Sequence, residues 1–170
     1  MSDFRTPPIK RHEALIPLSR DHYVGLVHAN RMKKSATADR VARHKAIAEF
    51  LDAWKSEIEP HFRDEERLLI PLIQDESDRR RLLDEHARLR EGAGRAANER
   101  KSIDPDPGFV EGLGRDLEQH IRWEERVLFN SIQDHATADQ LEHLSKLTAE
   151  VERARNRGRI GDEQERSGDP

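Results

Sequence analysis

The stretch His-Ile-Arg-Trp-Glu-Glu at residues 120–125 has a near copy, His-Phe-Arg-Asp-Glu-Glu, at residues 61–66. Each stretch places a glutamate four residues after its histidine. The two pairs are His61 with Glu65 and His120 with Glu124. On an α-helix this spacing puts both side chains on one face, one turn apart. One such pair has little weight, but two in matching frames predict two helices that present the same chemistry to a common interior.

Around both pairs, and through most of the chain, apolar residues recur at steps of three or four, the pattern of amphipathic helices. We therefore expect five helices, at about 17–34, 38–70, 77–101, 109–132 and 138–153. Short connections join the first four, which favours an all-α, up-down-up-down four-helix bundle. The shorter fifth helix should pack on the outside of this bundle.

The chain of 170 residues suits one domain with one core. We place this domain at residues 17–154, which comprise the bundle and the fifth helix. Residues 1–16 contain Pro7 and Pro8 and should form an irregular lead-in. Residues 155–170 are dominated by Gly, Arg, Glu and Asp, which predicts a disordered tail.

Pro60 lies inside the expected helix at 38–70, one residue before His61. Proline removes one backbone hydrogen bond from a helix and usually kinks it. A kink at this point would help to aim the His61 side chain. The alternative is a helix that breaks and restarts near Pro60.

Composition excludes several classes of function. The net charge is -4 with both signs interspersed, which argues against binding to nucleic acid or to an anionic membrane. The lack of cysteine excludes disulfides, cysteine-bound zinc, iron–sulfur clusters and thiol catalysis. The sequence shows neither a long apolar run nor a signal-peptide core, so we expect a cytoplasmic protein. No feature of the sequence identifies a protein partner.

Six polar residues occupy stripe positions where a helical core normally holds Leu, Ile or Val. They are His22, His61, Glu65, His86, His120 and Glu124. A buried carboxylate without partners is strongly unfavourable, and two that face each other are worse. Four imidazoles and two carboxylates from four helices therefore need a shared partner, and a pair of metal ions supplies it.

The donor types narrow the choice of metal. Mixed imidazole and carboxylate ligands suit iron, and also manganese or zinc. The zinc-protease pattern His-Glu-x-x-His is missing from the sequence. The Glu-x-x-His pattern of ferritin-like di-iron bundles is missing as well, since no glutamate stands three residues before any of the four histidines.

The order of the six residues is itself a repeat: a histidine, then His-x-x-x-Glu, and then the same again. This order resembles the hemerythrin-like, or HHE cation-binding, domain family over about residues 12–150. The pairs Asp21-His22 and Glu85-His86, and Glu-Glu-x-x-Leu in both halves, add to the similarity. The resemblance implies a non-haem di-iron centre with a bridging oxo or hydroxo group. It implies one iron on His22 and His61, the other on His86 and His120, and bridging by Glu65 and Glu124.

One position departs from the family pattern. Oxygen-carrying hemerythrins have a second histidine on the third helix, four residues after the first, and here that residue is Arg90. The second iron would then lack a ligand, which favours reactions with peroxide or nitric oxide over simple oxygen carriage. The Arg90 side chain either points into the centre or lies exposed along the surface.

Other residues near the pairs have simpler interpretations. Glu66 and Glu125 lie about 100° further round their helices, so we expect them to form salt bridges with arginines. The remaining histidines are expected not to be ligands: His12, His28, His44, His135 and His143. Residues within a turn of the ligands are expected to line a pocket for small gases: Leu26, Ile58, Leu89, Leu117 and Leu128, with Arg90 at its edge.

Three functions are compatible with these features. The first is a di-iron protein that binds or reacts with O2, NO or H2O2, as a sensor, a buffer or a weak peroxide-decomposing catalyst. The second is iron storage, or iron donation to damaged iron centres. The third is an interaction bundle with a structural metal. No residue stands out as a catalytic group separate from the metal ligands.

Overall fold

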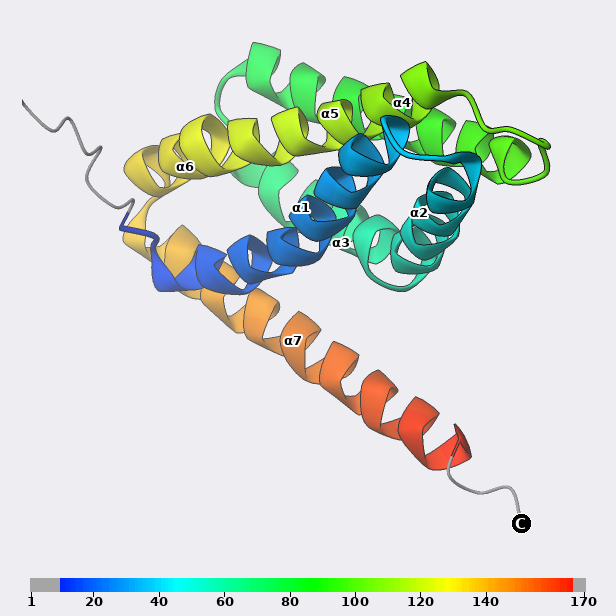
Figure 1. Ribbon diagram of the computed structural model, residues 1–170. Helices are drawn as coiled ribbons and strands as arrows, with labels where there is room; N and C mark the ends of the chain where they lie inside the picture. Colours follow the sequence, from blue (N-terminus) through cyan, green and yellow to red (C-terminus); the bar gives the residue numbers. More distant parts are fainter. Residues whose placement is uncertain (1–9, 167–170) are drawn as a thin grey trace, which may run out of the picture.

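The computed structural model describes residues 10–166, with side chains up to residue 156. Every regular element in this range is helical (Figure 1). The α-helices are α1 (Ile16–Ala36), α2 (Arg40–Ala53), α3 (Glu59–Leu69), α4 (Glu76–Glu99), α5 (Pro107–Trp123), α6 (Phe129–His135) and α7 (Ala138–Arg166). Four shorter helical segments are η1 (Glu13–Leu15), η2 (Trp54–Ile58), η3 (Ile70–Leu72) and η4 (Glu124–Leu128).

The helices form the expected four-helix bundle, with α7 as an additional C-terminal helix. The first bundle helix is α1, and the third is α4. The second consists of α2, η2 and α3, and the fourth consists of α5, η4 and α6 (Figure 1). In space α1 packs against α2 and α5, and α4 packs against α2, α3 and α5. Helices that are consecutive along the chain are therefore neighbours, and the fourth returns to the first. None of the described helices has both the length and the apolar character needed to cross a bilayer.

The second bundle helix differs from the expected unbroken helix at 38–70. A π-helical turn, η2, lies between α2 and α3, and the backbone N–H of Glu59 reaches back five residues to the carbonyl of Trp54. Pro60 therefore falls in the first turn of α3, where its missing N–H is tolerated. The helix neither simply kinks nor breaks at Pro60, because the π turn comes just before it and α3 begins around it. A second π turn, η4, begins at Glu124.

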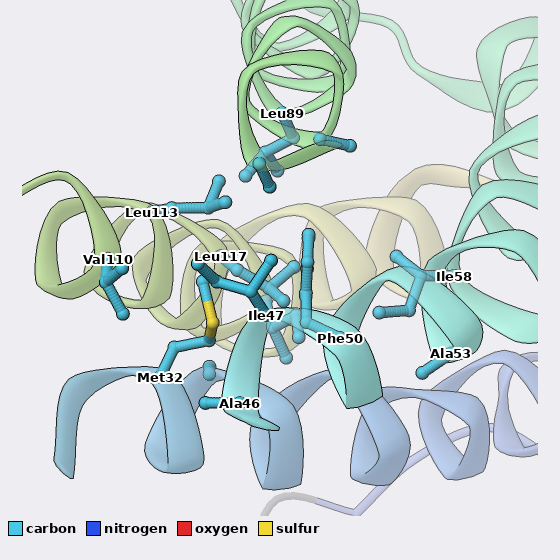
Figure 2. Packing of buried hydrophobic residues seen from close by; sticks show 14 of the residues in the cluster. Met32, Ala46, Ile47, Phe50, Ala53, Ile58, Leu89, Val110, Leu113 and Leu117 are labelled. Atoms are coloured by element: carbon cyan, nitrogen blue, oxygen red, sulfur yellow. The ribbon is translucent and has the colours of Figure 1, made fainter. Parts of the chain in front are cut away.

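Two apolar clusters fill the bundle, and the six polar stripe positions lie between them. The first cluster includes Met32, Phe50 and Leu117, and the second includes Leu15, Phe129 and Ile132. On each bundle helix the histidine lies between members of the first cluster and members of the second. The flanking pairs are Leu18 and Ala29 around His22, Ile58 and Leu68 around His61, Leu82 and Leu89 around His86, and Leu117 and Trp123 around His120. Figure 2 shows part of the first cluster, where Met32, Phe50 and Leu117 meet from three helices. The polar layer is thus enclosed by apolar side chains on both sides.

The first described residues pack against α7 and the bundle. In the lead-in, η1 buries Ala14 and Leu15 completely, and it contacts α7. The buried Thr148 hydroxyl of α7 donates to the carbonyl of Ala14 over 3.1 Å. Pro7 and Pro8, and the other residues of 1–9, lie outside the described residues.

Helix α7 runs on to Arg166, beyond the expected boundary at residue 154. Part of the segment expected as a disordered tail, 155–166, is therefore helical, while residues 167–170 lie outside the described residues. Arg155 explains part of this extension, since its guanidinium pairs with Asp21 on α1 and with Asp64 on α3. Such long-range ion pairs leave no trace in the local composition from which the tail was predicted.

Candidate metal centre

The structure brings all six polar stripe residues together in the middle of the bundle. They form two groups whose ligand atoms lie within 4.8 Å of one another: His22, His61 and Glu65, and Glu65, His86, His120 and Glu124. Glu65 belongs to both groups. The side chains come from α1, α3, α4, α5 and η4, so every bundle helix contributes. All six are buried, and Glu65, Glu124 and His86 have no exposed surface.

The two oxygens of Glu65 face different histidines. Its Oε1 lies 3.3 Å from Nε2 of His22 and 3.0 Å from Nε2 of His61. Its Oε2 lies 3.5 Å from Nε2 of His86. We call His22 and His61 the first half-site, and His86 and His120 the second half-site. The Glu65 carboxylate offers one oxygen to each half-site.

The Glu124 carboxylate also offers one oxygen to each half-site, but with Oε2 towards the first and Oε1 towards the second. Its Oε2 lies 3.1 Å from Nε2 of His22 in the first half-site. Its Oε1 lies 3.2 Å from Nε2 of His120 and 3.7 Å from Nε2 of His86 in the second half-site. Each half-site is therefore faced by two imidazole nitrogens and by one oxygen from each carboxylate.

The donor atoms fit two metal ions. Several buried atoms of the centre have no hydrogen-bond partner: Nε2 of His61, His86 and His120, Oε2 of Glu65, and both oxygens of Glu124. Buried polar groups without partners are rare because desolvation costs free energy. Two ligands at right angles on one ion, with bonds of about 2.1 Å, lie about 3.0 Å apart. The nitrogen–oxygen separations of 3.0–3.3 Å in the first half-site match that spacing.

A second carboxylate faces the other ring nitrogen, Nδ1, of each histidine. The contacts are His22 to Glu125 at 2.7 Å, His86 to Glu66 at 2.8 Å, His120 to Glu85 at 2.8 Å, and His61 to Asp21 at 3.4 Å. The first three are hydrogen bonds, and the fourth is longer. A histidine that donates from Nδ1 keeps the Nε2 lone pair free for a metal ion. The carboxylates thus set the tautomer that metal binding requires for His22, His86 and His120, whereas Nδ1 of His61 only faces Asp21 without a hydrogen bond.

These orienting carboxylates are the functional residues that the sequence interpretation missed. The salt bridges expected for Glu66 and Glu125 are present, with Arg90 and Arg11 respectively. Their contacts with His86 and His22 were not expected. The sequence does contain a pattern that could have indicated them: an acidic residue stands directly beside a candidate ligand at four places, as in Asp21-His22 and Glu124-Glu125.

The sequence matches one known family profile. The profile of the Hemerythrin HHE cation binding domain matches residues 18–132, which is more than half of the chain. The chain belongs to the hemerythrin HHE cation-binding domain family. The same profile also matches residues 77–159, starting next to the first residue of α4, where the second half of the internal repeat begins. No curated protein and no solved structure matches the chain.

Two phenylalanines hold imidazole rings of this HHE domain in place. The ring of Phe62 stacks on His86 with the centroids 3.9 Å apart and the planes 5° from parallel. The ring of Phe129 stacks on His22 at 5.3 Å and 23°. Both phenylalanines are buried. In each half-site, one histidine therefore stacks on a phenylalanine ring and also forms a hydrogen bond from Nδ1 to an orienting carboxylate.

The charges inside the HHE domain favour protonated imidazoles when no metal ion is bound. Burial lowers the pKa of His22, but the facing carboxylates of Glu124 and Glu125 outweigh burial and raise that pKa well above its usual value. Burial also lowers the pKa of His86, but the facing carboxylates of Glu124 and Glu65 outweigh burial and raise this pKa to about 10. Burial raises the pKa of Glu65, yet the neighbouring imidazoles bring this pKa well below its usual value. A metal ion that binds here must displace protons, because a ligating imidazole is neutral.

The residues expected to line a gas pocket are packed around the centre. Ile58, Leu89, Leu117 and Leu128 are buried in the two apolar clusters, and Leu26 is half-buried against the first cluster. Two cavities near the surface are lined by other side chains. The gas pocket therefore stays a prediction.

Arg90 lies at the surface. Its side chain is 35% exposed, and Nη1 donates to Glu66 over 2.8 Å while Nε donates to Glu59 over 3.0 Å. Since Glu66 also accepts from Nδ1 of His86, Arg90 reaches the second half-site only through that carboxylate. Arg90 is thus half-buried at the edge of the bundle and pairs with Glu59 and Glu66.

The other histidines lie outside the two groups of candidate ligands. His12 caps η1 by accepting from the backbone N–H of Ala14, and His135 bonds the carbonyl of Ser131. His44 lies near the carbonyl of Ile103, at the far end of the bundle. His28 and His143 are not members of either group.

Proposed function

We propose that this protein holds two iron ions in its HHE domain and uses them to bind or react with small oxidants or gases: O2, NO or H2O2. It would act as a sensor, a buffer or a weak peroxide-decomposing catalyst. One observation carries the proposal: Glu65 and Glu124 each offer one oxygen to each half-site. Two carboxylates placed in this way suit a bridged pair of ions better than a single ion.

The donor set supports iron. Imidazole and carboxylate ligands with further positions open are typical of non-haem iron sites. Two divalent ions also need more negative charge than Glu65 and Glu124 supply, and a bridging oxo or hydroxo group would provide it. When bound, such an iron pair supplies electrons and open coordination positions for a small ligand.

The residues of the chain set the conditions for that chemistry. His22, His61, His86 and His120 would supply two imidazoles for each ion, and the two glutamates would bring the protein ligands of each ion to four. The apolar clusters on both sides keep bulk water away from the centre. An enclosed centre with free coordination positions suits a diatomic molecule or a peroxide rather than a large organic substrate.

Metal analysis and rapid mixing test the proposal. Protein reconstituted with ferrous iron without oxygen should hold about two irons per chain, and after oxidation it should show oxo-bridged charge-transfer bands in the near ultraviolet. Stopped-flow mixing with O2, NO and H2O2 should then show which ligand reacts. The variant His143→Ala, at a histidine outside the centre, should behave as the wild type. Iron below about half an ion per chain in the reconstituted wild type would overturn the proposal.

A further inference from the structure

Each orienting carboxylate is itself paired with an arginine. The pairs are Glu125 with Arg11, Asp21 with Arg155, Glu66 with Arg90, and Glu85 with Arg81. Arg81 and Arg90 both belong to α4, and their carboxylates orient the two histidines of the second half-site. Arg11 precedes η1 and Arg155 lies on α7, so both come from outside the four bundle helices. The first half-site therefore depends on the terminal segments, whereas the second is organised within the bundle.

Arg155 joins α7 to two bundle helices. Its guanidinium contacts Oδ2 of Asp21 on α1, and its Nη2 lies 2.6 Å from Oδ2 of Asp64 on α3. Val151 is the last described residue of α7 that packs on the apolar core. Between residues 152 and 156, Glu152 and Arg155 form ion pairs with the bundle. A cavity of about 630 Å³ opens between α1, η2 and α7, with Asp21 and Arg155 in its wall. The ion pairs of Arg155 thus hold this part of α7 beside an open space.

Asp21 is shared between Arg155 and His61. The same oxygen, Oδ2, faces the guanidinium of Arg155 and lies 3.4 Å from Nδ1 of His61. The other three orienting carboxylates lie 2.7–2.8 Å from their histidines. His61 is therefore the ligand whose orienting contact is longest, and the position of its carboxylate is set by a residue on α7.

We propose that Arg155 is a positioning residue for the first half-site, so that the docking of α7 sets how tightly His22 and His61 hold their metal ion. The second half-site, whose orienting carboxylates both pair with arginines of α4, does not depend on α7. The two ions of the centre then differ in how readily they leave, although their ligands are alike. This inference rests on the proposed function, because it requires that the centre binds two ions.

The test isolates each half-site before Arg155 is changed. The variant His120→Ala retains both histidines of the first half-site, and His61→Ala retains both histidines of the second. Binding of Co²⁺, followed by its visible absorption, gives the metal affinity in each background, and the band intensity reports the coordination geometry. Arg155→Gln is introduced into both backgrounds. Arg153→Gln is the matched control, since Arg153 is exposed and donates only to the carbonyl of Ala149 on its own helix.

We expect Arg155→Gln to weaken Co²⁺ binding by about tenfold or more in the His120→Ala background, the usual effect of disturbing an orienting partner. In the His61→Ala background the change should stay within about twofold, and Arg155→Lys should restore part of the loss. Asp64→Asn, which removes the other anchor of Arg155, should act in the same direction. Thermal unfolding of the metal-free variants shows whether the fold is retained.

Equal weakening in both backgrounds would mean that α7 only stabilises the fold, and it would overturn the inference. So would wild-type-like affinity of Arg155→Gln in the His120→Ala background. In either case, a wild-type protein that binds two ions leaves the proposed function intact. A wild-type protein that binds neither Co²⁺ nor ferrous iron overturns the proposed function, and the inference with it.

Discussion

Nδ1 of His22 on α1 lies 2.7 Å from Oε1 of Glu125 on η4, so a hydrogen bond joins the first helix of the bundle to the last. The other three orienting contacts each join a histidine to a carboxylate on the preceding bundle helix: His61 to Asp21, His86 to Glu66, and His120 to Glu85. Together they form a closed ring around the centre. The packing of the helices and the orientation of the imidazoles are therefore coupled.

Removing one of the two carboxylates that face both half-sites should reduce the metal content. Glu65→Ala takes one oxygen from each half-site, so metal content should fall from about two ions per chain to below about one. Metal analysis after gel filtration measures this change. Glu142→Ala, at an exposed glutamate of α7 paired with Lys146, is the control and should retain both ions. Full metal content in Glu65→Ala would show that this carboxylate does not bridge.

Weakening an orienting contact should reduce affinity without removing the site. Glu125→Gln keeps the shape of the side chain but replaces a charged acceptor of the His22 hydrogen bond with a neutral one. We expect metal affinity to fall by about 10- to 100-fold, with the same stoichiometry at saturation. Competition with a chelator of known affinity gives the constants. The exposed residue Glu150 supplies the control variant Glu150→Gln, and equal affinities of the two variants would contradict this role for Glu125.

Metal binding should release protons near neutral pH. The pKa of His86 rises to about 10 in the metal-free protein, so below that pH its imidazole holds a proton that a metal ion must displace. Affinity should consequently increase as the pH rises towards this value and decrease as the pH falls. Calorimetric titration in buffers of different ionisation enthalpy counts the protons. Heats that do not vary with the buffer would contradict the expectation.

The contact between α1 and α5 should be sensitive to one methyl group. A Cβ at Gly114 would lie 2.7 Å from the carbonyl oxygen of Ala29, and backbone cannot easily move away. We expect Gly114→Ala to lower the free energy of unfolding by about 1–3 kcal/mol. A Cβ at Gly112, on the same helix, would meet nothing within 4 Å. Gly112→Ala should therefore raise the free energy of unfolding by roughly 0.5–1 kcal/mol, because alanine favours helix. Urea unfolding of both variants provides the comparison.

The helical class of the chain and the identity of the central polar residues follow from local patterns. Periodicity of three to four residues marks the bundle helices, and it also marks His22, His61, His86 and His120 as polar residues on apolar stripes. Helix geometry alone places such residues in the interior. For that reason the gathering of the six residues was predictable without any knowledge of how the helices meet.

The local irregularities were only partly predictable. Pro60 indicated an irregular helix near His61, but the π turn at Trp54–Ile58 begins six residues before Pro60. The π turn at Glu124–Leu128 contains no proline, so no residue in it indicated an irregular helix. Both depend on how the helices fit their neighbours, which the pattern of a single helix does not contain.

By itself, the sequence determined an all-α bundle with four histidines and two glutamates inside it, because burial on a helix follows from spacing along one segment. Only the tertiary structure decided which oxygen faces which half-site, that Glu125 orients His22, and that Arg155 reaches Asp21. Residues 21 and 155 stand far apart in the chain and meet through the docking of α7 on the bundle. Contacts of this kind depend on how whole helices pack, and the periodicity of either helix alone does not specify them.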